Sequence, residues 1–146
     1  MSENNDDFCG VVRRYHDKEK TIVKVEYFKM NGKLEGTYKE YHENGQLEKE
    51  VNYIDGLRQG IFKSYWENGQ LSREVNYIDG KMNSNYKEYH ENGQLRKEVN
   101  YIDGKREGIF KSYYENGQLY EEVNYIDGKK MVLKNHIVKM DNYMEK

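Results

Sequence analysis

Polar and apolar residues alternate along most of this 146-residue chain, which is typical of β-strands with one buried and one solvated face. The alternating runs are separated at regular intervals by Asn-Gly or Asp-Gly pairs. These pairs favour tight hairpin turns, because Asn, Asp and Gly tolerate the positive φ that such turns require. The pattern therefore predicts an antiparallel meander of short strands.

The pattern returns every 24 residues. The motif Glu-Asn-Gly-Gln-Leu begins at Glu43, Glu67, Glu91 and Glu115, and each copy ends in Val-Asn-Tyr-Ile-Asp-Gly. Residues 35–82 and 83–130 agree at 38 of 48 positions, which indicates a duplicated pair of units. Fixed periodicity of this kind predicts an array of four repeats. Their bounds are 35–58, 59–82, 83–106 and 107–130.

Modified copies are expected at the ends of a repeat array, where one side of a repeat has no neighbour. We interpret residues 1–8 as an N-terminal tail and residues 9–34 as a degenerate first repeat that lacks the Asn-Gly turn. Residues 131–146 are predicted to form a C-terminal cap. An amphipathic helix there is suggested by four apolar residues spaced by 4, 3 and 4: Leu133, Ile137, Met140 and Met144. One or two last strands within 131–139 are the alternative.

The turns predict a register. If Asn116-Gly117 is a two-residue loop of type I′, Tyr114 lies opposite Leu119 and Phe110 opposite Val123. The same register places a lysine opposite a glutamate in every repeat: Lys39–Glu50, Lys63–Glu74, Lys87–Glu98 and Lys111–Glu122. Asp103-Gly104, treated in the same way, sets Val99 opposite Gly108 and Lys97 opposite Phe110.

This register separates an aromatic-aliphatic face from a polar face. The first carries Phe110, Tyr114, Leu119, Val123 and Tyr125, and the second carries Lys111, Tyr113, Tyr120, Glu122 and Asn124. Three glycines fall on the crowded first face, where the lack of a side chain leaves room for a ring: Gly36, Gly60 and Gly108. The serine at the matching place of the third repeat, Ser84, does not fit this explanation.

The register also predicts curvature, because each repeat slips by two residues over two strands. That slip tilts the strands by about 35° unless a glycine bulge absorbs part of it. The predicted fold is all-β: a single-layer antiparallel meander of tandem 24-residue β-hairpin repeats, twisted and coiled, with a short C-terminal capping segment. Whether the sheet is open or nearly closed into a barrel is left undecided.

Composition limits the function. The chain is 36% hydrophobic and 34% charged with 15 Tyr, so much of what it buries must be aromatic. Net charge is −2 with both signs interleaved, which gives no basic field for a nucleic acid. Cys9 is the only cysteine, which favours a reduced, cytoplasmic setting. No apolar run approaches the length of a membrane span, and the acidic start shows no signal peptide.

No catalytic residue, metal site or cofactor site is expected. His42 and His90 occupy equivalent positions two repeats apart, roughly 19 Å along the array, which is too far to share one zinc ion. Trp66 and Tyr114 hold the same position, so we interpret the histidines as groups that pack on a sheet face. The Asp-Gly turns supply one Asp each and lack the clustered oxygen ligands of a calcium site.

A row of tyrosines on the polar face is the candidate partner-binding surface, because tyrosine offers a large contact area and a hydroxyl at low entropic cost. The row contains Tyr41, Tyr65, Tyr89 and Tyr113, each two residues after Lys39, Lys63, Lys87 or Lys111, and Trp66 is added to it. The alternative is a solvated face whose rings pack across strands. The aromatic face is the other candidate, and a homodimer through that face or through a sheet edge is one way to cover it.

The repeat resembles the bacterial variant of the MORN (membrane occupation and recognition nexus) repeat. The resemblance lies in Gly-x-aromatic-Lys-x-Tyr-aromatic-Glu-Asn-Gly-Gln-Leu, followed by Val-Asn-Tyr-x-Asp-Gly-Lys-x-x-Gly. It covers residues 35–130 well and 9–34 weakly. The departures are His42 and His90 at the second aromatic place, Leu57 for the turn Lys, and Ser84 for a Gly.

The resemblance implies a protein-binding module without catalytic residues. Similar bacterial proteins are often described as YwqK-like antitoxins, so a cognate toxin is the implied partner. A membrane-surface or phospholipid-binding scaffold is the alternative, disfavoured by the lack of a Lys/Arg cluster. Partner specificity is expected where the copies differ, at His42/Trp66/His90/Tyr114, Glu48/Ser72/Arg96/Tyr120 and Lys49/Arg73/Lys97/Glu121.

Overall fold

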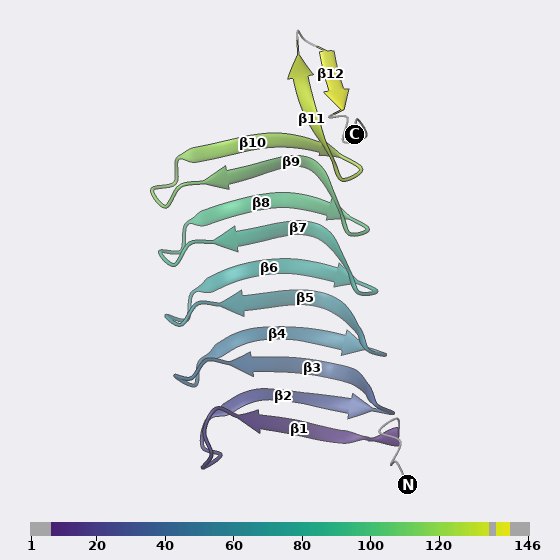
Figure 1. Ribbon diagram of the computed structural model, residues 1–146, viewed down its shortest axis with the longest axis vertical. Coiled ribbons are helices and arrows are strands. Elements are labelled where there is room, and N and C mark those ends of the chain that lie inside the picture. The colour runs from purple at the N-terminus through teal and green to yellow at the C-terminus, as the bar shows by residue number, and fades with distance from the viewer. Residues whose placement is uncertain (1–6, 135–136, 141–146) are drawn as a thin grey trace, which may run out of the picture.

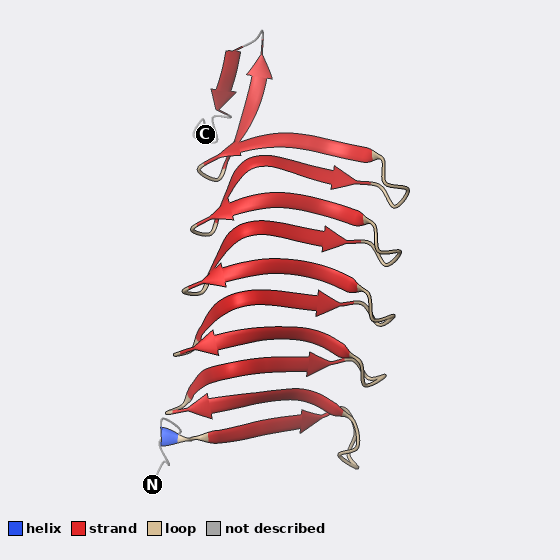
Figure 2. Cartoon of the chain, turned by 180° about the vertical axis from the view of Figure 1, so that it is seen from behind, coloured by secondary structure: helices blue, strands red, loops and turns tan. Residues whose placement is uncertain are grey.

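The computed structural model describes residues 7–134 and 137–140. These residues form one antiparallel sheet of twelve strands, each paired with its neighbours in chain order (Figure 1). In the described part of the chain no second layer covers either face of the sheet (Figure 2). The predicted all-β, single-layer meander is therefore confirmed, and the sheet is open.

The bounds of the twelve strands are β1 Gly10–Tyr15, β2 Val23–Met30, β3 Lys33–Tyr41, β4 Leu47–Ile54, β5 Leu57–Tyr65, β6 Leu71–Ile78, β7 Lys81–Tyr89, β8 Leu95–Ile102, β9 Lys105–Tyr113, β10 Leu119–Ile126, β11 Lys129–Lys134 and β12 Ile137–Met140. Strands β3 to β10 are 8 or 9 residues long, and each ends at an Asp-Gly or Asn-Gly segment.

The degenerate N-terminal copy folds as a hairpin of β1 and β2. In place of the Asn-Gly turn, the Asp17 carboxylate accepts hydrogen bonds from the backbone N–H groups of Thr21 and Ile22, at 3.0 and 2.9 Å. Together with the Thr21 hydroxyl, these donors lower the pKa of Asp17 to about 2, since they stabilise its charged form. One carboxylate thus organises this loop.

The C-terminal segment contains strands and no helix within its described residues. β11 and β12 pair with each other and extend the sheet beyond β10 (Figure 1). The strand alternative, made for residues 131–139, is therefore correct for residues 131–134 and 137–139. Met144, part of the suggested helix face, lies outside the described residues.

The Asp-Gly turns have the predicted type I′ form. Asp103 and Gly104 have φ of 50° and 82°, and Ile102 pairs with Lys105 across the turn. The same positive φ pair occurs at Asp55, Asp79 and Asp127 with their glycines. Only two residues connect the strands at each of these turns.

The Asn-Gly turns differ from the prediction. Tyr114 N–H donates to the Gln118 carbonyl and Gly117 N–H to the Tyr114 carbonyl, both at 2.9 Å, which encloses a loop of three residues. Only Gly117 has positive φ in this loop. Asn116 instead uses its side-chain oxygen to accept from Gln118 N–H at 3.0 Å, and this local bond favours the longer loop.

The longer loop is compensated by a bulge after Leu119. Leu119 pairs with Tyr113 instead of Tyr114, so this leucine lies on the polar face and its predicted place on the aromatic face is wrong. Tyr120, predicted on the polar face, packs edge-on against Tyr114 with ring centroids 5.1 Å apart. Beyond the bulge the predicted register holds, and all four lysine–glutamate pairs are confirmed.

A second bulge lies at the glycine positions. Between the pairs Glu98–Lys111 and Asn100–Glu107, the single residue Val99 faces three residues, 108–110. The predicted partners Val99–Gly108 and Lys97–Phe110 are therefore wrong.

Backbone conformation explains these glycines better than crowding does. Gly108 has φ of 80°, and a Cβ built there would meet nothing within 4 Å, so the explanation that glycine leaves room for a ring is wrong. Gly36 and Gly60 show the same two features. Ser84 adopts φ of 81° at the matching place, a conformation that is unfavourable for a residue with a Cβ.

The bulge removes the expected slip between repeats. Lys63 pairs with Glu74, and Glu74 pairs with Lys87, so residues 24 apart lie at the same level of the sheet. The predicted two-residue slip and its tilt of about 35° are wrong, because the bulge supplies two extra residues per repeat. Equivalent side chains therefore stand in straight rows across the strands.

The core is a single row of valines covered by rings. Val51, Val75 and Val99 are only 4%, 1% and 3% exposed. Val25 and Val123 continue the row at its ends, less deeply buried. Tyrosine and phenylalanine side chains pack over the row, as the composition predicts.

Candidate functional site

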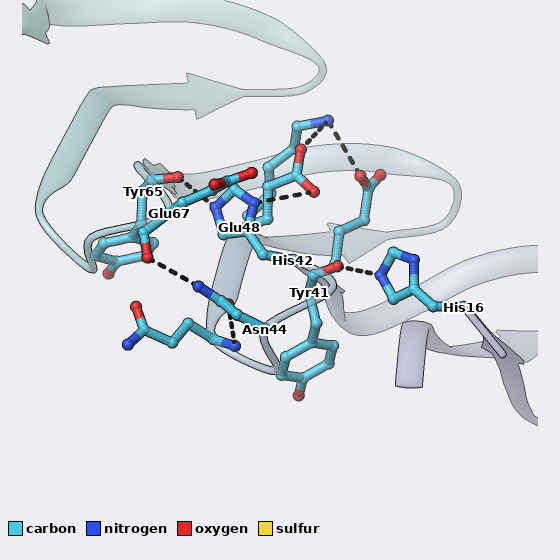
Figure 3. A network of polar contacts seen from close by, with 10 residues as sticks. His16, Tyr41, His42, Asn44, Glu48, Tyr65 and Glu67 are labelled. Atoms are coloured by element: carbon cyan, nitrogen blue, oxygen red, sulfur yellow. Dashed lines mark hydrogen bonds and ion pairs between the residues drawn. The ribbon is translucent and has the colours of Figure 1, made fainter. Parts of the chain in front are cut away.

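The Asn-Gly loops lie along one side of the sheet, at the ends of the strands, and we call this side the Asn-Gly edge. The Asp-Gly turns form the opposite side, the Asp-Gly edge. The Asn-Gly edge holds a network that joins each repeat to the next, part of which is drawn in Figure 3. His42 Nε2 lies 2.9 Å from the carbonyl oxygen of Tyr65, in the following repeat. Trp66 Nε1 donates to the carbonyl of Tyr89 at 3.2 Å, in the equivalent arrangement. His42 and Trp66 both place a ring N–H on a carbonyl of the next repeat, so packing alone does not explain them.

The other histidines of this row behave alike. His90 Nε2 lies 2.9 Å from the Tyr113 carbonyl, and His16 Nε2 lies 2.7 Å from the Tyr41 carbonyl. Each histidine thus contacts a carbonyl of a different repeat. Within the described residues, no three His, Cys, Asp or Glu side chains converge on a metal-sized site.

The asparagine of the repeated motif belongs to the same network. Asn44 Nδ2 donates to the carbonyl of Glu67 in the next repeat at 3.0 Å, while its Oδ1 accepts from Gln46 N–H within its own loop at 3.0 Å. Asn68 and Asn92 make the same two contacts. The motif is therefore scaffold, and its amide joins neighbouring hairpins.

The polar face carries the predicted row of tyrosines beside the lysine–glutamate rows. Lys63 lies between Glu50 and Glu74 on the neighbouring strands, so positive and negative side chains alternate across the face. Tyr113 donates a hydrogen bond from its hydroxyl to Glu98 at 3.0 Å, and burial together with this bond raises the pKa of Tyr113. The structure therefore brings together the predicted tyrosines and lysines on one surface.

Trp66 is separate from that row. Its indole N–H is used between repeats, and its ring borders a hollow that also contains His90 and Arg96. The structure thus assigns Trp66 a place in the scaffold, away from the tyrosine row. The sequence could have shown this, because Trp66 is one residue after Tyr65 and strand parity puts the two on opposite sides.

The aromatic face forms a groove of about 530 Å³ that crosses β3 to β9, which we call the aromatic groove. Ring pairs that bridge neighbouring strands line it, with centroids about 6 Å apart: Tyr38–Tyr53, Phe62–Tyr77 and Tyr86–Tyr101. Each pair meets edge to face, the arrangement that aromatic quadrupoles favour.

Two carboxylates in the aromatic groove are already satisfied. Glu40 accepts from the Tyr38 hydroxyl at 2.7 Å and from Lys49 at 3.1 Å. Burial alone would raise the pKa of Glu40, but these hydrogen bonds outweigh it and lower that pKa. Glu88 accepts from Tyr86 at 2.9 Å, and burial together with this bond raises the pKa of Tyr86 to about 12.

Two arginines in the aromatic groove were not anticipated from the sequence. Arg58 donates to the hydroxyls of Tyr53 and Tyr77, at 3.3 and 3.1 Å. Arg106 makes the equivalent bonds to Tyr101 and Tyr125, at 3.3 and 3.0 Å. The available signal was their separation of 48 residues, since both follow an Asp-Gly turn in alternate repeats.

The hairpins stack in one open layer and are bonded from repeat to repeat, and the described region has no second layer. These features define a linear repeat protein. The MORN repeat variant family matches residues 31–55, 58–79, 82–103 and 106–127, which is more than half of the chain. This chain belongs to the MORN repeat variant family. MORN repeats are generally non-catalytic interaction modules, and their all-β fold is typically non-enzymatic.

A comparison with curated proteins gave no match. Within the described residues there is no helix long and apolar enough to cross a membrane.

Proposed function

We propose that this chain is a protein-binding module whose partner is a toxin, so that the chain acts in the cytoplasm as an antitoxin or immunity protein. The observation that supports protein binding is the uncovered aromatic groove, which presents paired rings at intervals of one repeat. A concave aromatic surface of this kind is characteristic of an interface. The toxin as partner rests on the resemblance of the repeats to bacterial antitoxins.

The tyrosine row on the polar face is the first contact surface to test. Tyr41, Tyr65, Tyr89 and Tyr113 repeat at roughly 10 Å, two strand spacings, which suits an extended partner. The lysines beside them are each flanked by glutamates, so the surface carries little net charge. On this face we propose that the tyrosines supply contact area and that Lys39, Lys63, Lys87 and Lys111 supply polar contacts.

The experiment is co-expression with a toxin-like protein encoded beside this chain, followed by calorimetry of the purified pair. We expect a stoichiometric complex and loss of toxicity in the cells. A neighbouring toxin that neither binds nor is neutralised would overturn the antitoxin proposal.

The tyrosine row is tested with the double variant Tyr65→Ala/Tyr113→Ala, which should weaken partner binding more than it lowers the free energy of unfolding. Val11→Ala/Met30→Ala is the matched control, because these side chains are 56% and 48% exposed and lie in β1 and β2, outside the row. Equal affinity of the double variant and the control would remove the tyrosine row from the interface.

A membrane-surface scaffold is the second candidate, favoured by a row of exposed aliphatic side chains near the Asp-Gly turns. Its members are 43–55% exposed: Ile54, Leu57, Ile78, Ile102 and Ile126. Such side chains can enter the interfacial region of a bilayer. Flotation with phospholipid vesicles tests this candidate, and an unchanged flotation of the variant Ile78→Ser/Ile102→Ser would exclude the aliphatic row as the contact.

A further inference from the structure

The aromatic groove has a charge opposite to that of the whole chain. Its lining contains five cations, Lys49, Arg58, Arg73, Lys97 and Arg106, and two carboxylates, Glu40 and Glu88. The groove therefore carries three excess positive charges, whereas the chain carries a net charge of −2. Concentrated positive charge on an acidic protein indicates a ligand of negative charge.

The two carboxylates do not neutralise most of these cations. Lys49 pairs with Glu40 at 3.1 Å, and Glu88 pairs at 3.2 Å with Arg96, which is not part of the groove lining. Within the described residues, the remaining four cations of the groove form no ion pair. Their charge is available to a ligand.

Arg58 and Arg106 are held in place by the groove itself. Tyrosine hydroxyls accept one bond from Nε and one from Nη1 of each guanidinium. Each guanidinium also lies over the ring of its second tyrosine, 5.2 Å from the centroid of Tyr77 or Tyr125. A guanidinium has five N–H donors, so three of them remain for a carboxylate on the open side. Ordering these side chains in advance reduces the entropic cost of binding.

The spacing of the cations indicates the shape of the ligand. Arg73 and Lys97 occupy equivalent positions one repeat apart, two strand spacings or roughly 9.6 Å. Arg58 and Arg106 are two repeats apart, or roughly 19 Å. A polyproline II helix rises about 9.3 Å per turn of three residues. An acidic side chain at every third residue of such a helix therefore matches the repeat of the groove.

We propose that the aromatic groove binds an extended, polyproline II-like segment of a protein partner that carries an acidic residue at every third position. This inference rests on the proposed protein-binding function and names the chemistry of the partner. The segment runs across the strands, with its carboxylates on the arginines and its intervening residues on the tyrosine and phenylalanine edges. Bidentate contact with arginine makes carboxylates strong ligands for these sites.

Other anionic polymers fit the groove less well. Single-stranded nucleic acids bind through stacking of bases on open ring faces. Here the rings are paired edge to face, and guanidinium groups lie over Phe62, Tyr77, Phe110 and Tyr125. Anionic membranes attract clusters of projecting Lys and Arg, whereas these cations line a concave surface beside aromatic rings.

The test uses a fluorescent peptide with four Glu-Pro-Pro triplets, and a control peptide of the same composition with its glutamates consecutive. Anisotropy titrations with the full chain should show tighter binding of the periodic peptide. The variant Arg58→Gln/Arg106→Gln should weaken that binding about tenfold or more, since two charge-assisted contacts are lost. The control Lys33→Gln/Lys81→Gln removes the same charge from two exposed lysines that do not line the groove, and it should leave affinity within about twofold.

Folding is checked by thermal unfolding of each variant. The second variant Arg58→Lys/Arg106→Lys keeps the charge and removes the planar fork, so it should bind with intermediate affinity. Equal binding of the two peptides would overturn the proposal. An equal loss of affinity in Arg58→Gln/Arg106→Gln and in Lys33→Gln/Lys81→Gln would overturn it as well. Tighter groove-dependent binding of single-stranded DNA or of phosphatidylserine vesicles would also overturn it.

A failure of the groove inference can be distinguished from a failure of the proposed function. A toxin that binds the arginine variant with unchanged affinity would refute the groove inference and leave the protein-binding proposal intact. A toxin that binds no form of the chain would refute the antitoxin proposal alone, because the peptide titration does not depend on it.

Discussion

The Asn-Gly edge and the Asp-Gly edge bond side chains to the backbone by opposite chemistry, the first between successive repeats and the second within a repeat. At the Asn-Gly edge, side chains of one repeat donate to backbone carbonyls of the next, as Asn44 does to Glu67 and Trp66 to Tyr89. At the Asp-Gly edge, side chains accept from backbone N–H groups of their own repeat. There Gln59 accepts from Asp79 N–H at 2.9 Å, and Glu107 accepts from Asp127 N–H at 2.8 Å.

This difference explains which residue types each edge uses. The Asn-Gly edge needs one side chain that both donates and accepts, and among short side chains an amide satisfies both. All four complete repeats accordingly have Asn there. The Asp-Gly edge needs only an acceptor, and Glu35, Gln59 and Glu107 all serve. Identical residues across repeats therefore mark a structural requirement at one edge, and mixed residues mark a looser requirement at the other.

The largest expected effect is the loss of a donor at the Asn-Gly edge. Asn68→Asp directs a carboxylate oxygen toward the carbonyl of Glu91, which now accepts from Nδ2 at 3.0 Å. We expect the free energy of unfolding to fall by about 2 kcal/mol, because a hydrogen bond is replaced by a repulsive contact. Urea denaturation followed by Trp66 fluorescence measures it.

The matched control for that variant is Gln59→Glu at the opposite edge. Glutamate still presents an oxygen to Asp79 N–H, so the free energy of unfolding should change by less than about 0.5 kcal/mol. Equal destabilisation by the two substitutions would contradict the division of the edges into donor and acceptor sides.

The next prediction concerns the hydrogen bond donated by the ring N–H of Trp66. Trp66→Phe keeps an aromatic ring and removes the donor to Tyr89, so it should lower the free energy of unfolding by about 1 kcal/mol. Trp66→His restores the donor found in His42 and His90 and should recover part of that loss. Circular dichroism in urea is the measurement, since the only tryptophan is absent from both variants. A histidine variant less stable than the phenylalanine variant would argue against the hydrogen bond.

The glycine bulge near the Asp-Gly edge provides a stabilising substitution. Ser84→Gly removes the cost of positive φ at a residue with a Cβ and should raise the free energy of unfolding by about 0.5–1 kcal/mol. Gly60→Ser is the reciprocal variant and should lower it by a similar amount, because its Cβ meets no neighbour and only the backbone is strained. Both are read from urea midpoints, and changes of the same sign would contradict a purely conformational origin.

The smallest expected effect concerns the ion pairs at the Asp-Gly edge. Lys81 lies 3.3 Å from Asp103, and both side chains are largely exposed. Lys81→Leu copies Leu57, the equivalent residue one repeat earlier, and should lower the free energy of unfolding by less than about 0.5 kcal/mol. The difference should shrink in 1 M NaCl, where exposed charges are screened. A large effect that does not depend on salt would show that packing of the lysine stem is what matters.

The sequence predicts this fold correctly wherever the structure depends on the alternation of polar and apolar residues in a strand. Alternation fixes the strands, and the Lys–Glu pairs fix the register of each Asn-Gly hairpin, so four pairings such as Lys63–Glu74 are correct. The bulge at each Asn-Gly loop could not be predicted, because Asn-Gly is compatible with more than one loop length. The hydrogen bond of the Asn side chain decides between these lengths. Gly60 is a similar case, since sequence cannot separate a crowded glycine from one with positive φ.

The candidate surfaces are predictable to different extents. The tyrosine row follows from parity alone, because each Tyr lies two residues after a Lys within one strand. The charge of the aromatic groove does not follow from parity. Arg58 and Arg73 come from different strands, and the bulge of Gly60 lies between them in the chain. Only the true register shows that these cations face the same rings.

The bulge that cancels the slip between repeats also affects how such a chain can evolve. Because residues 24 apart share one level, an added copy meets the same neighbours as the copy it follows. A segment of 24 codons can thus be duplicated in frame without repacking any existing contact. The two groove arginines, Arg58 and Arg106, are equivalent residues of the 48-residue duplication, so one in-frame duplication is enough to repeat this feature of the groove.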